Sequence, residues 1–120
     1  MIKNLALIIE DDPQLSIIFS EALVLAGYEV KAITDGQVAL EVLKTSAPAL
    51  VVLDLHLPRV AGEEILNWIK ANTRLANTHI MVATADARKA RELRGKADLV
   101  LVKPIRFGQL RDLAARLKRD

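Results

Sequence analysis

Polar side chains that could do chemistry follow four short apolar runs of this 120-residue sequence. In chain order they are Glu10, Asp11 and Asp12, then Asp54, then Thr84, and finally Lys103. Three consecutive carboxylates repel one another, and the cost grows wherever water is excluded. Such a cluster persists only where it is exposed, caps a helix or is balanced by a cation. The question for the rest of the sequence is which of these applies.

Metal binding and phosphoryl transfer are the chemistry that these residue types favour. Carboxylate oxygens are the hard ligands that Mg²⁺ prefers, usually together with retained waters. If Asp54 meets the first acidic cluster, a bound Mg²⁺ would offset the repulsion. Lys103 would add a second positive charge and Thr84 a hydroxyl donor, so a tetrahedral anion beside Asp54 would find metal, ammonium and hydroxyl together.

Each residue also has an ordinary structural interpretation. Asp12 stands directly before Pro13, an arrangement typical of a helix N-cap followed by proline in the first turn. Thr84 alone could be a β-branched strand residue, and a Lys-Pro pair at Lys103 is common at strand ends. The functional hypothesis therefore depends on the combination: the acidic cluster at 10–12, Asp54, Thr84 and Lys103 each follow a different strand of the same chain.

The apolar runs are continuous rather than alternating, which is typical of strands buried on both faces. They predict strands at 5–9, 29–33, 50–53, 80–83 and 99–102, and helical patterns at 13–26, 36–46, 61–72, 87–94 and 106–119 lie between or after them. This alternation predicts an α/β fold with a doubly wound parallel sheet and helices on both faces. In such sheets ligands bind beyond the carboxyl ends of the strands, where the polar residues occur.

Length and composition limit the classes that remain. A chain of 120 residues with 52% hydrophobic residues suits one well-buried core and a single domain. No apolar run approaches the roughly 20 residues that span a bilayer, and the start lacks a signal-peptide pattern, so we expect a cytoplasmic protein without a membrane segment. The absence of cysteine excludes a disulfide framework, a thiolate nucleophile and cysteine metal sites.

Charge is distributed unevenly along the chain. Residues 1–85 hold 6 Lys and Arg against 10 Asp and Glu, whereas residues 86–120 hold 11 against 5. A basic surface could meet an anionic partner, but scattered arginines on amphipathic helices are usually solvated. With few aromatic residues and no recognition-helix module, we do not expect nucleic acid as a partner.

Five short motifs carry a resemblance to a known family. They are "IIEDDP" at 8–13, "TDGQVAL" at 34–40, "VVLDLHLPRVAG" at 51–62, "VATA" at 82–85 and "LVKPI" at 101–105. Together the sequence resembles the receiver domain of bacterial two-component response regulators, of which the chemotaxis-type single-domain receiver is the simplest member. The resemblance covers essentially the whole chain. It implies one receiver domain over 1–120 and a flavodoxin-like sheet of strand order 2-1-3-4-5 with five helices.

The resemblance also implies roles for individual residues. Asp54 would be the phosphoacceptor, with Thr84 and Lys103 holding phosphoryl oxygens. Asp11 would bind Mg²⁺ directly and Glu10 would bind it through water. Asp54 and the backbone carbonyl of His56 would be further ligands. The expected partners are a sensor histidine kinase or phosphotransfer protein and an unknown output protein, with a possible homodimer through the fourth to fifth helices. Beyond self-phosphorylation from a phosphodonor and autodephosphorylation, no enzymatic activity is expected.

Two departures from the family pattern lie where receivers change shape. Val100 occupies a position where the family usually has Tyr or Phe, and the segment from Thr84 to Lys103 is shorter than usual. Two other side chains have an ordinary structural interpretation. We expect Trp68 to pack in the core and His79 to lie at the surface.

Three hypotheses therefore compete. The first is a phosphorylatable receiver that signals through protein contacts, since no effector domain follows the fifth helix in these residues. The second is a degenerate receiver that serves as a constitutive interaction or dimerisation module. The third is a phosphatase of the haloacid-dehalogenase type, which normally needs a second aspartate two residues after the nucleophile, where this chain has His56.

Overall fold

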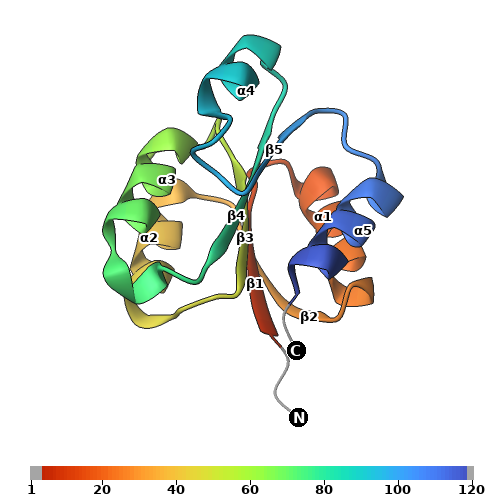
Figure 1. The fold of residues 1–120 in the computed structure, drawn as a ribbon, viewed down its shortest axis with the longest axis horizontal. Helices are drawn as coiled ribbons and strands as arrows, with labels where there is room; N and C mark the ends of the chain where they lie inside the picture. Colours follow the sequence, from red (N-terminus) through yellow and green to blue (C-terminus); the bar gives the residue numbers. More distant parts are fainter. Residues whose placement is uncertain (1–3, 119–120) are drawn as a thin grey trace.

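The computed structural model describes residues 4–118, and in this range five strands alternate with five α-helices (Figure 1). The strands are β1 (Asn4–Ile9), β2 (Tyr28–Ile33), β3 (Leu50–Asp54), β4 (His79–Thr84) and β5 (Leu99–Val102). The helices are α1 (Pro13–Leu25), α2 (Gly36–Thr45), α3 (Gly62–Ala71), α4 (Ala87–Leu93) and α5 (Phe107–Leu117), and a short 3₁₀ helix η1 (Thr73–Leu75) follows α3. Every predicted strand and helix is present, and most ends agree within one residue. The predicted end of the last helix, Arg119, lies outside the described residues.

All strand pairs are parallel, in the order β2-β1-β3-β4-β5, as the resemblance implied. The central strand β3 is buried along its whole length, which explains why its sequence is apolar without alternation. β5 forms one edge of the sheet and is only half-buried, with Val102 exposed.

Helices cover both faces of the sheet and create two separate cores. On one side α1 and α5 pack together and bury Phe19, Leu23 and Leu110 against β1 and β3 (Figure 1). On the other side α2 and α3 pack their buried side chains against apolar residues of β1, β3 and β4 in the second core, and α4 reaches it through Leu93. Trp68 is half-buried and packs against this second core, so its predicted packing role is confirmed.

Three helices begin with an aspartate cap at the carboxyl-end edge of the sheet. Asp12, Asp35 and Asp86 each accept hydrogen bonds from the backbone N–H groups two and three residues further on. Such caps satisfy N–H groups that lack partners in the first helical turn. The predicted capping role of Asp12 is confirmed, so the third carboxylate of the opening cluster has a structural task of its own.

The short segment between β4 and β5 produces a small fourth helix. α4 has only 7 residues, and a turn at residues 95–98 leads directly into β5. The expectation that His79 lies at the surface is wrong. Its side chain is 18% exposed, and its Nδ1 lies 3.3 Å from Oδ1 of Asp98 in this turn. None of the helices in the described range is both long and apolar enough to cross a membrane.

Candidate functional site

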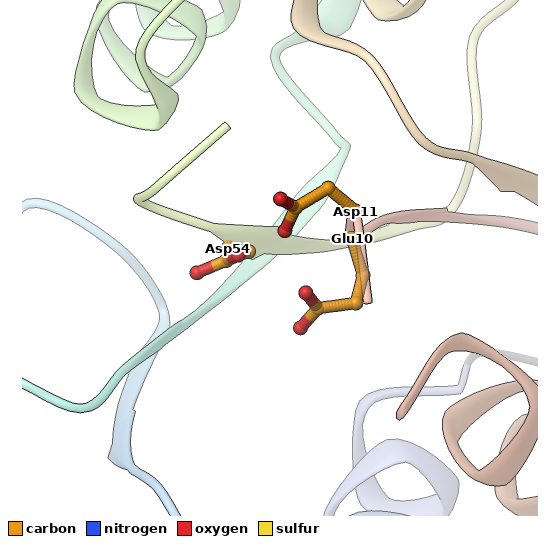
Figure 2. A group of neighbouring side chains, drawn as sticks. All are labelled: Glu10, Asp11 and Asp54. Carbon is orange, nitrogen blue, oxygen red and sulfur yellow. The ribbon is translucent and has the colours of Figure 1, made fainter. Parts of the chain in front are cut away.

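Three carboxylates converge at the carboxyl ends of two adjacent strands (Figure 2). Glu10 and Asp11 directly follow β1, Asp54 is the last residue of β3, and these strands pair side by side. One oxygen from each carboxylate lies within 4.8 Å of the other two. Glu10 and Asp54 are buried, whereas Asp11 is exposed and leaves the group open to solvent on one side.

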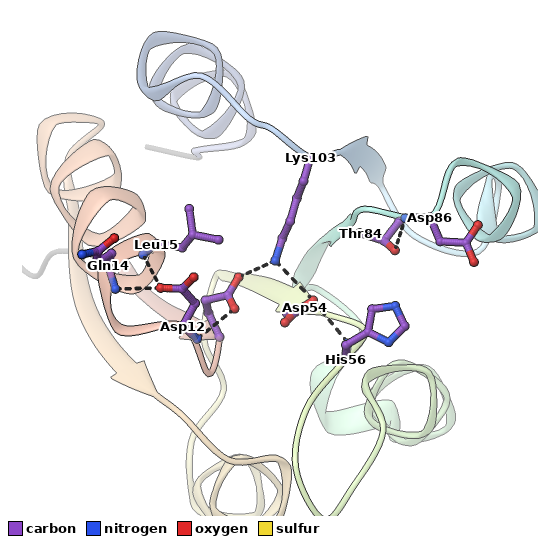
Figure 3. A network of polar contacts seen from close by, with 9 residues as sticks. Asp12, Gln14, Leu15, Asp54, His56, Thr84, Asp86 and Lys103 are labelled. Atoms are coloured by element: carbon purple, nitrogen blue, oxygen red, sulfur yellow. Dashed lines mark hydrogen bonds and ion pairs between the residues drawn. The ribbon is translucent and has the colours of Figure 1, made fainter.

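Lys103 supplies a positive charge to this group from the loop after β5 (Figure 3). Its Nζ lies 2.9 Å from Oε1 of Glu10 and 3.5 Å from Oδ1 of Asp54. Its backbone N–H donates to the carbonyl of Thr84 at 2.7 Å, which anchors the loop to the end of β4. The sequence predicts Lys103 beside Asp54. In the structure Nζ of Lys103 lies closer to the carboxylate of Glu10 than to that of Asp54.

The pKa values of Glu10 and Lys103 reflect this crowding. Burial raises the pKa of Glu10, opposed by hydrogen bonds from Lys103 and from the backbone N–H of Asp12, while nearby Asp54 raises it further. Burial alone would lower the pKa of Lys103, but its hydrogen bond to Glu10 and the charge of Asp54 outweigh that effect and raise it. Lys103 therefore stays an ammonium, and additional positive charge would relieve the remaining repulsion between the carboxylates.

The loop that follows Asp54 is held tightly against the end of β3. The backbone N–H of His56 donates to Oδ1 of Asp54 at 3.2 Å, and the N–H of Gly62 donates to the carbonyl of Leu55 at 3.0 Å. A Cβ atom at Gly62 would lie 2.2 Å from the carbonyl oxygen of Asp54, closer than any real contact. Glycine at position 62 is thus required for the loop to return beside Asp54, whereas the His56 side chain is exposed.

The same loop is also fastened to the start of α2, a connection that sequence reasoning missed. Nε of Arg59 donates to Oδ2 of Asp35 at 2.7 Å, and Arg59 has a φ of 67°, in the left-handed region. The backbone N–H of Gly36 approaches the carbonyl of Pro58 at 3.4 Å, and a Cβ at Gly36 would lie 2.3 Å from the carbonyl oxygen of Val60. These residues belong to two of the motifs that carried the resemblance. Those motifs were the feature of the sequence that could have indicated this connection.

Thr84 is fully buried at the end of β4, and Figure 3 shows it beside Asp86. Its Oγ1 accepts a hydrogen bond from the backbone N–H of Asp86 at 3.1 Å, and Asp86 in turn caps α4. Within the described range no hydrogen bond joins the Thr84 hydroxyl to Asp54 or Lys103. The hydroxyl hydrogen is therefore available to a further acceptor, and the position of this hydroxyl is linked to the start of α4.

The donor set fits a small, hard divalent cation. It consists of carboxylate oxygens from Glu10, Asp11 and Asp54, with no sulfur or nitrogen ligand in the group. Mg²⁺ is commonly held by one or two carboxylates while it keeps several waters, and the exposed side near Asp11 leaves room for them.

Comparison with known proteins agrees with this arrangement. The family model of the response regulator receiver domain matches residues 6–115. The polar-differentiation response regulator DivK of Brucella anthropi is 30% identical over 102 residues, which are 82% of this chain and 83% of DivK. The response regulator protein FleR of Pseudomonas aeruginosa is 34% identical over 113 residues, 92% of this chain but only 24% of FleR.

A solved structure gives the same result for the fold. The response regulator protein TrrA of Thermotoga maritima, crystallised in complex with Mg²⁺ and beryllofluoride, is 26% identical and superimposes with a TM-score of 0.84. The match covers 96% of this chain and 99% of the TrrA chain.

The chain thus belongs to the response regulator receiver domain family. Receiver domains act in two-component signal transduction, where they interact with histidine kinases or phosphotransfer proteins and with output proteins, and they are generally not enzymes. With the family established, the haloacid-dehalogenase-type alternative is set aside.

Proposed function

We propose that this chain is a phosphoacceptor receiver in which Mg²⁺-dependent phosphorylation of Asp54 controls contacts with other proteins. The observation that carries the proposal is the position of the Asp54 carboxylate, 3.5 Å from Nζ of Lys103 and within 4.8 Å of two further carboxylates. A single cationic side chain beside three carboxylates suits a site that gains both a metal ion and a phosphoryl group.

The contacts on Asp54 support different tasks for its two oxygens. Oδ1 faces both Lys103 and the backbone N–H of His56. We therefore assign the nucleophile to Oδ2, whose lone pairs are not engaged by these groups. In the reaction Oδ2 forms a bond to phosphorus while the phosphorus–nitrogen bond of a phosphohistidine breaks, and the electron pair of that bond leaves with the imidazole of the donor.

Neighbouring groups would stabilise the charge on the transferred phosphoryl group. Lys103 can donate to one phosphoryl oxygen through its ammonium, whose nearer partner in this structure is Glu10. The Thr84 hydroxyl, which now accepts from the backbone N–H of Asp86, can donate its own hydrogen to another phosphoryl oxygen. Glu10, Asp11 and Asp54, with the backbone carbonyl of His56, would hold Mg²⁺, which supplies charge neutralisation at the phosphoryl oxygens when bound.

The outer face of α1 is the surface that we propose for the protein phosphodonor. Ile17, Val24 and Leu25 are 60%, 54% and 66% exposed, and Ile18 is 40% exposed. α1 begins immediately after the acidic cluster, at the Asp12 cap, so a partner seated on it adjoins the phosphoacceptor site. A histidine kinase or phosphotransfer protein must bring its phosphohistidine to this edge of the sheet, and an exposed apolar helix face next to the site suits that task.

Phosphorylation from a small donor tests the central claim. The purified chain is incubated with acetyl phosphate and Mg²⁺, and its intact mass is measured. We expect one added phosphoryl group on the wild type, none on Asp54→Asn, and normal addition on Asp12→Asn, which keeps an N-cap beside the site. Equal addition to wild type and Asp54→Asn would place the chemistry elsewhere. No addition to the wild type would favour the alternative function, a constitutive interaction module in which the site persists without switching.

The same assay separates the site from the proposed docking face. Ile17→Asp should accept phosphate from acetyl phosphate at the wild-type rate but lose at least about tenfold in the rate of transfer from a phosphorylated histidine phosphotransfer protein. Val38→Asp, at an exposed apolar position on α2, changes the charge by the same amount and serves as the control, which should keep both rates. Parallel loss of both rates in Ile17→Asp would remove the docking assignment while leaving the phosphoacceptor proposal intact.

A further inference from the structure

A cavity of about 530 Å³ lies at the end of β4 opposite the acidic site. Its walls come from the end of α3, from η1, from the first residues of β4 and from the turn at 95–98. This volume falls in the range of cavities that hold small molecules, roughly 300 to 1,000 Å³. None of the residues proposed for phosphoryl transfer lines it, so the phosphoacceptor function does not explain it.

The lining combines an apolar interior with positive charge. Ile69, Leu75 and Ile80 are buried side chains that line the cavity. Lys70, in the last turn of α3, and Lys96, in the turn before β5, also line it, and both are exposed. Among the described residues no carboxylate lies within ion-pair distance of either lysine, so both ammonium groups are available to an anion.

His79 brings an unsatisfied polar atom to the same lining. Its Nδ1 lies 3.3 Å from Oδ1 of Asp98, whose Oδ2 accepts from the backbone N–H of Ile80 at 2.7 Å. In the described part of the chain one buried polar side-chain atom has no hydrogen-bond partner, and this atom is Nε2 of the His79 ring. A buried polar atom without a partner is costly and calls for an explanation.

Two further polar side chains of the lining, Thr78 and Asp98, already have partners. Thr78 already donates its hydroxyl to the carbonyl of Pro48 at 2.7 Å. Asp98 is the one carboxylate of the lining, and its two oxygens already face His79 and Ile80. Asn77 also lines the cavity and is exposed. The polar groups of the lining without a partner among the described residues are therefore the ammonium groups of Lys70 and Lys96, the side-chain amide of Asn77 and Nε2 of His79.

We propose that this cavity binds a small organic anion, with an apolar body against Ile69, Leu75 and Ile80 and a carboxylate between Lys70 and Lys96. A carboxylate would neutralise part of the unpaired positive charge of Lys70 and Lys96 and accept hydrogen bonds from their ammonium groups. Without Mg²⁺, the three carboxylates of the acidic site at the other end of the strands disfavour binding of the same anion there.

Binding can be followed by titrating the ¹⁵N-labelled chain with benzoate in the absence of Mg²⁺. We expect saturable shifts of the amides that line the cavity, with Kd on the order of a few millimolar for so small a molecule, and movement of the His79 Nε2 resonance. Benzyl alcohol, which keeps the ring without the charge, and acetate, which keeps the charge without the ring, should each bind more weakly.

Lysine variants test the charge contacts. Lys70→Ala and Lys96→Ala should each weaken benzoate binding about threefold, and the double variant about tenfold, as expected for exposed charge contacts. Lys31→Ala, on the exposed surface of β2, is the matched control and should bind as the wild type does. The proposal is overturned by shifts that do not saturate, by equal binding of benzyl alcohol, or by a double variant that binds like Lys31→Ala.

Discussion

The ammonium of Lys103 is 2.9 Å from the carboxylate of Glu10 and 3.5 Å from that of Asp54, so one cation serves two buried acids. In this arrangement Lys103 partly balances the carboxylates and competes with any metal ion that they would bind. The positive charge that offsets the repulsion among the carboxylates thus comes in part from a side chain of the protein itself.

Replacing this ammonium should have opposite effects on stability and on metal affinity. In Lys103→Met the buried Glu10 loses its partner, and the free energy of unfolding without Mg²⁺ should fall by about 1–3 kcal/mol. Mg²⁺ should bind about three to ten times more tightly, because the ion no longer faces a neighbouring positive charge. Urea denaturation with and without Mg²⁺ measures both quantities, with Lys31→Met as control. Weaker Mg²⁺ binding in Lys103→Met would contradict this role.

Mg²⁺ itself should stabilise the folded chain, since the unfolded chain cannot hold Glu10, Asp11 and Asp54 together. At ten times Kd the gain is about 1.4 kcal/mol. Thermal melts should show this gain in the wild type and in Asp12→Asn, and a much smaller one in Asp11→Ala. An equal increase in all three proteins would mean that the ion binds elsewhere.

Much of the fold and the site could be predicted because the informative residues follow strands. In parallel strands the apolar runs and the polar residues after them fix which ends meet, so the sequence alone predicts Asp54, Thr84 and Lys103 at one edge of the sheet. The Asp12 cap was predictable for a similar reason, because its donors are local in sequence.

The contacts that the sequence did not predict depend on side-chain directions across long separations. Arg59 reaches Asp35 from a loop 24 residues away, and Lys103 prefers Glu10 at a separation of 93 residues. His79 was misjudged because a histidine at a strand start is usually solvated, whereas here the turn at 95–98 places Asp98 against it. Sequence patterns fix which elements are neighbours but not which polar atoms pair within them.

The ion pair between Asp35 and Arg59 should make the loop after Asp54 sensitive to acid. The hydrogen bond from Arg59 holds the pKa of Asp35 below its usual value of 3.8. A lowered pKa in the folded state means that the pair stabilises above the unfolded pKa, and that this contribution is lost as pH falls through the folded pKa.

Asp35→Asn isolates this effect because asparagine can still cap α2. The variant should be less stable than the wild type at pH 6, and the difference should shrink as the pH falls through the lowered pKa of folded Asp35. Amide exchange at 55–61 should be faster in the variant at neutral pH. Urea midpoints of the two proteins across this pH range provide the measurement. A stability difference that does not change with pH would show that the cap, rather than the ionised pair, is what the substitution disturbs.

Val100 should limit how far phosphorylation changes the surface of β5 and α5. It pairs in register with Val82, is half-buried, and packs against the core formed by α2 and α3. Its short β-branched side chain has restricted χ1 freedom and cannot move in the way that a ring could. A two-state change extends only as far as the two states differ in their contacts, so the coupling from Thr84 to β5 should be small.

The contacts around Thr84 instead lead toward α4. Its hydroxyl accepts from the backbone N–H of Asp86, which caps α4, and Lys89 of that helix lies 2.6 Å from Glu63 at the start of α3. Movement of the hydroxyl toward a phosphoryl group would weaken the first of these contacts and release the start of the helix. Amide exchange of the free and beryllofluoride-bound chain should therefore differ most at 55–61 and 85–91, and less along 99–102 and 107–117. Large changes along β5 and α5 would show that Val100 does not restrict the response and that the aromatic side chain is dispensable for it.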